Sequence, residues 1–208
     1  MKNILHIIAS PRGNESRTLK ISKALIERLR QQFLDVNVDE LNVFAEPLPE
    51  MNITRVKGKY MLMSGEELNE DAEKSWKEIV AHINRFLAAD IVIVSTPMWN
   101  FSLPYQLKHY IDIIVQPGFT FKYGANGPEG LAKGKKLFVV SSHGGDYSEG
   151  SPFNSYDKLK PYLQQIFGFI GVVDQTFISA QPMDSGDAEL RGKMLEKAVE
   201  KARQIIIQ

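Results

Sequence analysis

Three short runs of almost uninterrupted apolar residues constrain this chain most, because each must be buried on both sides. They lie within residues 3–10, 90–97 and 135–142. Strands with two buried faces are typical of parallel sheets that helices cover from both sides. Residues 35–43 and 174–180 predict two further strands, and the first of these alternates in polarity as an edge strand can.

Helical periodicity separates these runs. Apolar side chains recur every three or four residues within 18–33, 70–88, 105–115, 156–167 and 188–207, and each segment predicts a helix. Strands that alternate with helices imply repeated strand–helix–strand units with right-handed crossovers. We therefore expect an α/β fold: a flavodoxin-like three-layer sandwich with a five-stranded parallel sheet of order 2-1-3-4-5 and helices on both faces. The long connections at 45–69 and 116–134 are expected to be functional or mobile.

Composition limits the possible partners. The 208 residues, of which 43% are apolar and 24% charged, suit a single domain over 1–208. The 25 basic and 25 acidic residues cancel, so we expect no nucleic acid and no membrane as partner. The absence of cysteine excludes disulfides and thiolate metal sites and agrees with a cytoplasmic location. The apolar N-terminus is interpreted as a first strand rather than a signal peptide.

The loop after the first predicted strand, SPRGNESRT at residues 10–18, favours an anion site. Ligands of open α/β sheets bind beyond the carboxyl ends of the strands. A helix begins here, and its first amides and its dipole attract negative charge. Plain N-capping by Ser16 is the alternative, but it does not need three hydroxyls, a glycine and two arginines within nine residues. The candidate donors are Ser10, Arg12, Ser16, Arg17 and Thr18.

Two common phosphate-binding motifs are absent, and this limits which anion the loop is expected to bind. No G-x-G-x-x-G is present, so the dinucleotide fingerprint is missing. The nearest match to a P-loop, GLAKGKK at residues 130–136, is one residue short, lacks the hydroxyl and leads into a predicted strand. A single phosphate monoester remains, and flavin mononucleotide (FMN) is a ligand of this topology.

The loop after the third apolar run could support a flat ring. Pro97 and Pro104 bracket it, and Met98, Trp99 and Phe101 form an apolar shelf beside the amide of Asn100. An isoalloxazine ring is apolar on its faces and polar on its rim, so it needs both features. After the fourth run, Ser142, His143, Gly144 and Gly145 offer close backbone approach and amide donors for the pyrimidine end of such a ring; an ordinary turn is the alternative for the glycine pair.

Five segments carry a resemblance to a known family: SPRGNESRT, PMWNFSLPYQLKHYID, GFTFKYGANGPEGL, GKKLFVVSSHGG and FGFIGVVD. They resemble the FMN-dependent NAD(P)H azoreductases, a quinone-reductase-like branch of the flavodoxin fold, over essentially the whole chain. The resemblance implies that Ser10, Ser16 and Thr18 hold the FMN phosphate with backbone help at Arg17. It implies that the ring rests on 97–101 and is capped by 142–145.

The same resemblance implies a homodimer with each active site at the subunit interface. Tyr123 and Phe169 match family residues that flank the substrate over the exposed face of the ring. Trp99 stands where Tyr is common, and His143 stands at a position that varies, so both could alter which acceptors fit. Neither residue should abolish flavin binding.

The expected activity is therefore transfer of two electrons from NADH or NADPH, by a ping-pong mechanism, to quinones and aromatic azo compounds. No side-chain nucleophile is expected, because the flavin N5 would carry the hydride. No metal site is expected either, since His109 and Asp112 share a helix face without a third ligand nearby. The alternatives are a nitroreductase with a different acceptor, an electron-carrier flavodoxin and a non-enzymatic sensor of NAD(P)H. The zero net charge disfavours the electron carrier, because electron carriers are usually strongly acidic.

Overall fold

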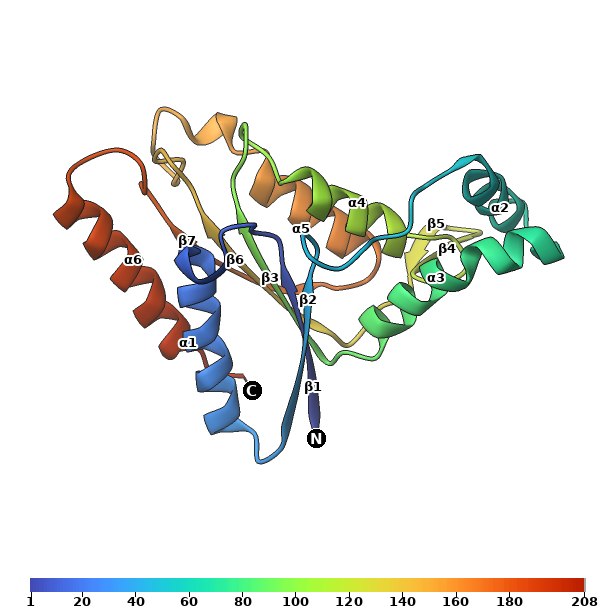
Figure 1. The fold of residues 1–208 in the computed structure, drawn as a ribbon, viewed down its shortest axis with the longest axis horizontal. Coiled ribbons are helices and arrows are strands. Elements are labelled where there is room, and N and C mark those ends of the chain that lie inside the picture. Colours follow the sequence, from blue (N-terminus) through green and yellow to red (C-terminus); the bar gives the residue numbers. More distant parts are fainter. Residues whose placement is uncertain (208) are drawn as a thin grey trace.

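Five parallel strands form the centre of the structure, a computed structural model that describes residues 1–207 (Figure 1). Hydrogen bonds join the strands in the order β2-β1-β3-β6-β7. Counted along the central sheet alone, this is the order 2-1-3-4-5, so the predicted flavodoxin-like α/β fold is confirmed. The strands are β1 (Lys2–Ile8), β2 (Val36–Asn42), β3 (Ile91–Pro97), β6 (Lys136–Ser142) and β7 (Asp174–Ala180).

Helices cover both faces of this sheet because the strands alternate their side chains between two cores. Ile4 of β1 belongs to the core beneath α1 (Arg17–Gln32) and α6 (Ala188–Arg203). Its neighbour Leu5 belongs to the opposite core, which also contains Trp76 and Phe86. The helices of that second face are α3 (Glu70–Leu87), α4 (Tyr105–Ile114) and α5 (Leu159–Phe169).

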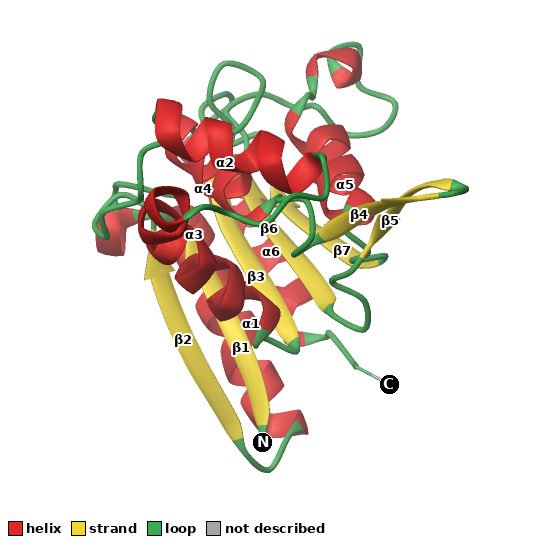
Figure 2. Ribbon diagram, turned by 90° about the vertical axis from the view of Figure 1, so that its right-hand side faces the viewer, coloured by secondary structure: helices red, strands yellow, loops and turns green. Residues whose placement is uncertain are grey.

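The two long connections are more ordered than the sequence suggested. The first contains α2 (Ile53–Met63), which Asn52 caps by accepting from the amide of Arg55. The second forms a hairpin of β4 (Phe121–Gly124) and β5 (Gly127–Gly130), which projects beside the central sheet in Figure 2. The helix expected from residue 156 begins only at Leu159, because a short 3-10 turn (Asn154–Tyr156) precedes it.

The carboxyl ends of the central strands lie level with one another, which positions the loops that follow them. Pro97 at the end of β3 pairs with Ser142 at the end of β6, and Ser142 pairs with Ala180 of β7. Backbone bonds continue this register: the amide of Met98 donates to Ser142 O at 2.9 Å, and that of His143 donates to Ala180 O at 3.0 Å. The loops after β1, β3, β6 and β7 therefore meet at one edge of the sheet.

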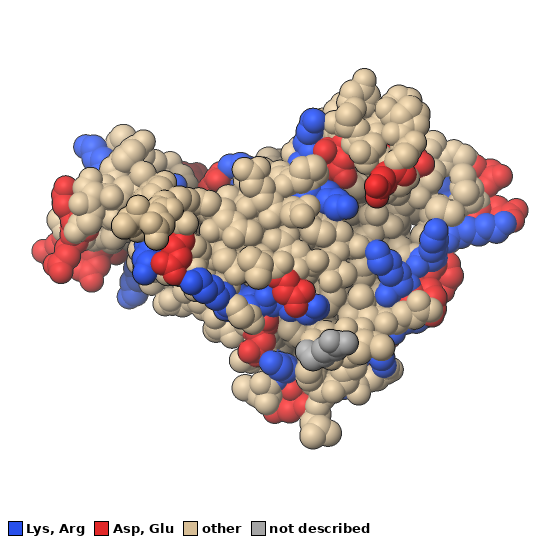
Figure 3. Space-filling view, turned by 180° about the vertical axis from the view of Figure 1, so that it is seen from behind, with Lys and Arg blue, Asp and Glu red and all other residues tan. Residues whose placement is uncertain are grey.

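Figure 3 shows Lys and Arg side chains interspersed with Asp and Glu side chains over one face. Within residues 1–207, none of the helices has the length and apolar character that crossing a bilayer demands.

Candidate functional site

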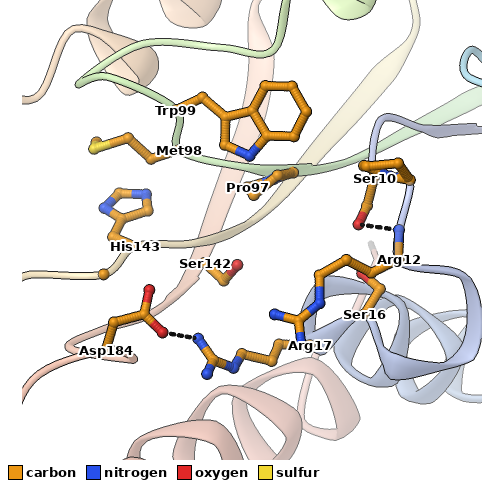
Figure 4. Close-up of a pocket in the computed structure, with 12 residues that line it drawn as sticks. Ser10, Arg12, Ser16, Arg17, Pro97, Met98, Trp99, Ser142, His143 and Asp184 are labelled. Carbon is orange, nitrogen blue, oxygen red and sulfur yellow. Dashed lines mark hydrogen bonds and ion pairs between the residues drawn. The ribbon is translucent and has the colours of Figure 1, made fainter.

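A pocket opens at the carboxyl edge of the sheet, where four loops meet (Figure 4). Its cavity has a volume of about 150 Å³ and is partly open to solvent. The lining residues come from the loops after β1, β3, β6 and β7: Ser10, Pro11, Arg12, Ser16, Arg17, Pro97, Met98, Trp99, Ser142, His143, Gly144 and Asp184.

One end of the pocket is formed by the first turn of α1. Ser16 is the N-cap, and its hydroxyl oxygen accepts from the amide of Leu19 at 3.4 Å and lies 2.9 Å from Thr18 Oγ1. Among residues 1–207, the amides of Arg17 and Thr18 have no hydrogen-bond acceptor. Free first-turn amides at the positive end of a helix dipole are suited to an anion.

Two arginines extend along the open side of this end (Figure 4). The guanidinium of Arg17 donates to Asp184 Oδ1 at 2.7 Å, so the loop after β7 is tied to α1. Arg12 has only a loose contact, at 3.9 Å, with the exposed Glu15. Arg12 is therefore the freer of the two cations, while Asp184 compensates the charge of Arg17.

The shelf after β3 contains a strained turn. Asn100 and Phe101 both have positive φ, 47° and 68°, although neither is glycine. Trp99 and Ser102 on either side exchange two backbone hydrogen bonds of 2.9 Å each. Positive φ at both central residues is the pattern of a tight type I′ hairpin turn, and it costs about 1–2 kcal/mol per non-glycine residue. Such strain concentrates at functional sites, and here it turns the backbone at the pocket rim.

Aromatic rings pack against the strained turn on both sides. The Trp99 ring lies 5.7 Å, centroid to centroid, from Phe44 and 6.5 Å from Tyr105. The Phe101 ring lies 5.4 Å from Tyr156, on the other side of the turn. The rings of Trp99 and Phe101 remain partly exposed, at 37% and 48%. The turn therefore presents apolar surface at the pocket while its neighbours keep it in place.

Two glycines allow the turn after β6 to lie close to its neighbours. A Cβ on Gly144 would lie 3.0 Å from Asp184 Oδ2, and a Cβ on Gly145 would lie 3.2 Å from the Tyr147 hydroxyl. Both distances are shorter than ordinary contacts, so side chains at these positions would push Asp184 or Tyr147 aside. Glycine at both positions therefore lets Asp184 and Tyr147 keep their places beside the turn.

His143 is buried in the wall of the pocket. Its Nδ1 lies 3.0 Å from Gln181 Oε1, and its Nε2 lies 3.0 Å from Ser141 Oγ. Burial lowers the pKa of His143 below the usual value, because desolvation outweighs the attraction of Asp157 and the bond to Gln181. The imidazole is therefore neutral at physiological pH.

Most of the residues expected to hold a cofactor meet at this pocket. The structure places nine of them in its lining: Ser10, Ser16, Arg17, Pro97, Met98, Trp99, Ser142, His143 and Gly144. The other four adjoin it: Thr18 contacts Ser16, Asn100 and Phe101 follow Trp99, and Gly145 follows Gly144. Their roles in binding stay predictions.

The two residues expected to flank a substrate lie elsewhere on the chain. Tyr123 is on β4 and is 61% exposed, and Phe169 ends α5. They are linked through Phe121, whose ring centroid is 5.6 Å from that of Tyr123 and 4.8 Å from that of Phe169. Neither residue lines the pocket of the same chain.

Sequence reasoning did not single out Asp184 or Pro11. Asp184 lies four residues beyond the end of β7, at the same sheet edge as the other loops. Applying the rule of carboxyl-end loops to the fifth strand would have found it. Among residues 1–207, no three His, Asp or Glu side chains gather as a metal site would require.

Known proteins resemble this chain over its whole length. The pattern of a family described as a flavodoxin-like fold matches residues 2–206. An FMN-dependent NADH:quinone oxidoreductase of Nitratidesulfovibrio vulgaris is 34% identical over 208 residues, which is 100% of both chains. The crystal structure of an azoreductase from Bacillus anthracis is 28% identical, with a TM-score of 0.84 over 99% of this chain and 100% of that one. An FMN-dependent NADH-azoreductase from Bacillus anthracis, solved in complex with FMN, is 25% identical with a TM-score of 0.83 over 97% and 98%.

Proposed function

This chain belongs to the flavodoxin-like fold family, and we propose that it is an FMN-dependent oxidoreductase that transfers two electrons from NAD(P)H to quinones and aromatic azo compounds. The observation that carries the proposal is the pocket whose lining extends from the first turn of α1, with its free amides, to Trp99 at the start of the strained turn. One end suits a phosphate and the other suits a flat ring.

The residues present fit FMN in their chemistry. Hydroxyls of Ser10, Ser16 and Thr18 and the amides of Arg17 and Thr18 are the donors that a phosphate monoester requires. Met98 and Trp99 offer apolar surface for the ring. Among the described residues that line the pocket, Asp184 alone carries a carboxylate, and it is paired with Arg17, so it does not oppose the phosphate as a free charge.

When bound, FMN supplies the chemistry of electron transfer between donor and acceptor. The chain itself binds and orients. In the proposed complex the α1 end would hold the phosphate, the turn after β3 would support the ring, and the amides around Gly144 and Gly145 would face its polar rim as fixed dipoles. Because donor and acceptor would use the same open side of the pocket in turn, we expect ping-pong kinetics, with parallel lines in double-reciprocal plots.

NADH is the donor that we expect to be preferred, which is the donor named for the relatives in Nitratidesulfovibrio and Bacillus. Comparing kcat/KM for the two nucleotides tests this preference.

A homodimer is the second part of the proposal. Tyr123 and Phe169 do not line the pocket of their own chain, and a second copy would bring them to it. Exposed aromatic side chains lie on or beside the turn after β3, among them Phe101, Tyr105 and Tyr156, and such surface is typical of interfaces. Light scattering coupled to gel filtration should report twice the 23.5 kDa chain mass. The cytoplasmic location stays a prediction that rests on the absence of cysteine.

The decisive experiment is cofactor binding followed by turnover. The purified protein should take up FMN with quenching of flavin fluorescence, and it should bind riboflavin, which lacks the phosphate, much more weakly. The FMN-loaded protein should then oxidise NADH in the presence of benzoquinone and of methyl red. A protein that binds neither flavin contradicts the whole proposal. A protein that binds FMN but oxidises no NADH with either acceptor contradicts the enzymatic part alone.

A further inference from the structure

His143 lines the pocket, but both of its ring nitrogens are already engaged by neighbours. The residue is only 3% exposed. Its Nδ1 faces Gln181 on the loop after β7, and its Nε2 faces Ser141 at the end of β6, each at 3.0 Å. The imidazole therefore links the end of β6 to the loop after β7.

The neighbours of Gln181 settle which nitrogen carries the proton. The Oε1 of Gln181 also lies 2.9 Å from the backbone nitrogen of Tyr147, which can only donate. This atom is consequently the carbonyl oxygen of the amide, and it accepts from Tyr147 and from His143 together. Nδ1 of His143 must then bear hydrogen. In the neutral ring Nε2 is left as an acceptor, so the hydroxyl of Ser141 donates to it.

The same contacts hold the turn that faces the predicted rim of the ring. The backbone of His143 donates to Ala180 O at 3.0 Å, and its carbonyl accepts from Met183 at 2.9 Å. His143 thus attaches the turn at 142–145 to β7 and to the loop after it, through both its backbone and its side chain. If the side-chain bonds were lost, this turn would keep only its backbone connections.

We propose that His143 is a positioning residue: a neutral imidazole, protonated at Nδ1, that clamps the turn at 142–145 to Gln181 and Ser141 and adds no positive charge or proton beside the bound ring. The inference deepens the proposed function, because the ligand is the FMN proposed for this pocket. The charged side chains that face His143 or its turn are Asp157, and Asp184 with its partner Arg17. Tyr147 lies against the imidazole with its ring centroid at 5.9 Å.

The tautomer can be measured on the full-length protein without FMN. Four histidines are present, so a His143→Gln variant identifies the resonances of His143 in nitrogen-15 spectra. Between pH 6 and 8 we expect a protonated Nδ1 and an unprotonated Nε2, with shifts that do not titrate. A ring protonated at Nε2, or charged at pH 7, would overturn the proposal. The measurement stands even if FMN fails to bind, so it separates this inference from the proposed function.

A second variant tests what the neutral clamp does for the ligand. In Gln181→Glu a carboxylate replaces the neutral acceptor, which should raise the pKa of His143. Below that pKa the two side chains would form an ion pair with no net charge, and above it they would carry one negative charge beside the pocket. The ratio of FMN dissociation constants between this variant and the wild type should therefore change at least about threefold from pH 6 to 8, since the net charge near the ring alters affinity by Coulomb interaction. The ratio cancels the titration of the phosphate itself.

Gln164→Glu introduces the same charge on the exposed face of α5 and should leave the ratio constant. Circular dichroism and a urea midpoint establish that each variant is folded. A constant ratio for Gln181→Glu would show that His143 does not influence the bound ring, and it would overturn the assignment. Nitrogen-15 shifts of wild-type His143 that titrate between pH 6 and 8 would do the same.

Discussion

Arg17 and Asp184 meet across the mouth of the pocket at 2.7 Å, although 167 residues separate them in the chain. Arg17 belongs to the first turn of α1, and Asp184 belongs to the loop after β7. The amide of Asp184 also donates to Gly144 O at 2.9 Å, which fixes the carboxylate in place. An acidic group therefore stands at an otherwise cationic anion site, where it reduces the positive charge available to a ligand phosphate.

Removing that negative charge should strengthen binding of a phosphate-bearing cofactor. We expect Asp184→Asn to lower the dissociation constant of FMN about fivefold, roughly 1 kcal/mol for a largely exposed ion pair. Affinity for riboflavin should not change, because it has no phosphate. Glu15→Gln, which neutralises the exposed acid near Arg12 at 3.9 Å, is the matched control and should have less effect. Fluorescence titration measures all three, and weaker FMN binding by Asp184→Asn would contradict the electrostatic argument.

Ser16 should be needed for the phosphate rather than for the ring. Hydrogen bonds to charged groups contribute about 1.5–3 kcal/mol, so Ser16→Ala should weaken FMN binding about tenfold and leave riboflavin binding unchanged. The variant also loses the N-cap, at a cost of about 1 kcal/mol in the free energy of unfolding. Ser22→Ala is the control, since Ser22 is buried in the same helix and donates only to Leu19 O at 3.3 Å. Equal losses for FMN and riboflavin would refute the phosphate role.

The features that the sequence could predict are those that depend on local pattern. Continuous apolar runs and helical spacing located the five central strands to within two residues at each end and identified the helices that cover them. The loops at 10–18, 97–101 and 142–145 could be assigned to one site because parallel strands bring their carboxyl ends to one edge. Helix α2 was not predicted from the sequence. Gly58 is its only buried residue, so the segment has little apolar periodicity.

Contacts between distant segments could not be predicted in the same way. Nothing near Asp184 in the chain indicates that it faces Arg17, and Gln181, which contacts His143, lies 38 residues away on the loop after β7. The positive φ of Phe101 could not be predicted either, since a large aromatic residue is disfavoured in that conformation. Tertiary packing imposes these arrangements against local preference.

The strain at Phe101 can be measured with a pair of variants. Phe101→Ala and Phe101→Gly both delete the ring that lies 5.4 Å from Tyr156, and they differ only in how well they accept a φ of 68°. The glycine variant should be more stable by about 1 kcal/mol in urea denaturation, because glycine adopts left-handed backbone without steric cost. At Lys74, within α3 and exposed, the same pair should reverse, with alanine more stable by about 1 kcal/mol. The prediction is wrong if alanine is the more stable residue at both positions.

Stability should fall in mild acid because of His6. The imidazole is buried in β1, with Nε2 at 2.7 Å from Ser95 Oγ, and burial lowers its pKa in spite of the neighbouring Glu40. The unfolded chain therefore binds the proton more readily, so stability is lost as pH falls below about 6.5, the ordinary pKa of histidine. Burial also lowers the pKa values of His82 and His143, which act in the same direction. The urea midpoint of the wild type should fall as the pH is lowered from 7.5 to 5.5. In His6→Asn the midpoint should fall less over this range, and an equal fall in both proteins would exclude His6 as a cause.

The hairpin that carries Tyr123 should depend on one close backbone contact. A Cβ on Gly130 would lie within 2.6 Å of Gly171 Cα, and backbone cannot move aside as a flexible side chain can. Gly130→Ala should therefore displace β5 from the end of α5 and destabilise the protein by about 3 kcal/mol, the upper range for overpacking. Gly124→Ala, in the paired strand of the same hairpin, would meet no atom closer than 3.8 Å and should be nearly neutral.

Because the Phe121 ring packs on Phe169 at 4.8 Å, the displaced hairpin of Gly130→Ala should also separate Tyr123 from Phe169. Urea denaturation compares the two variants, and equal stabilities would show that the backbone contact does not hold the hairpin.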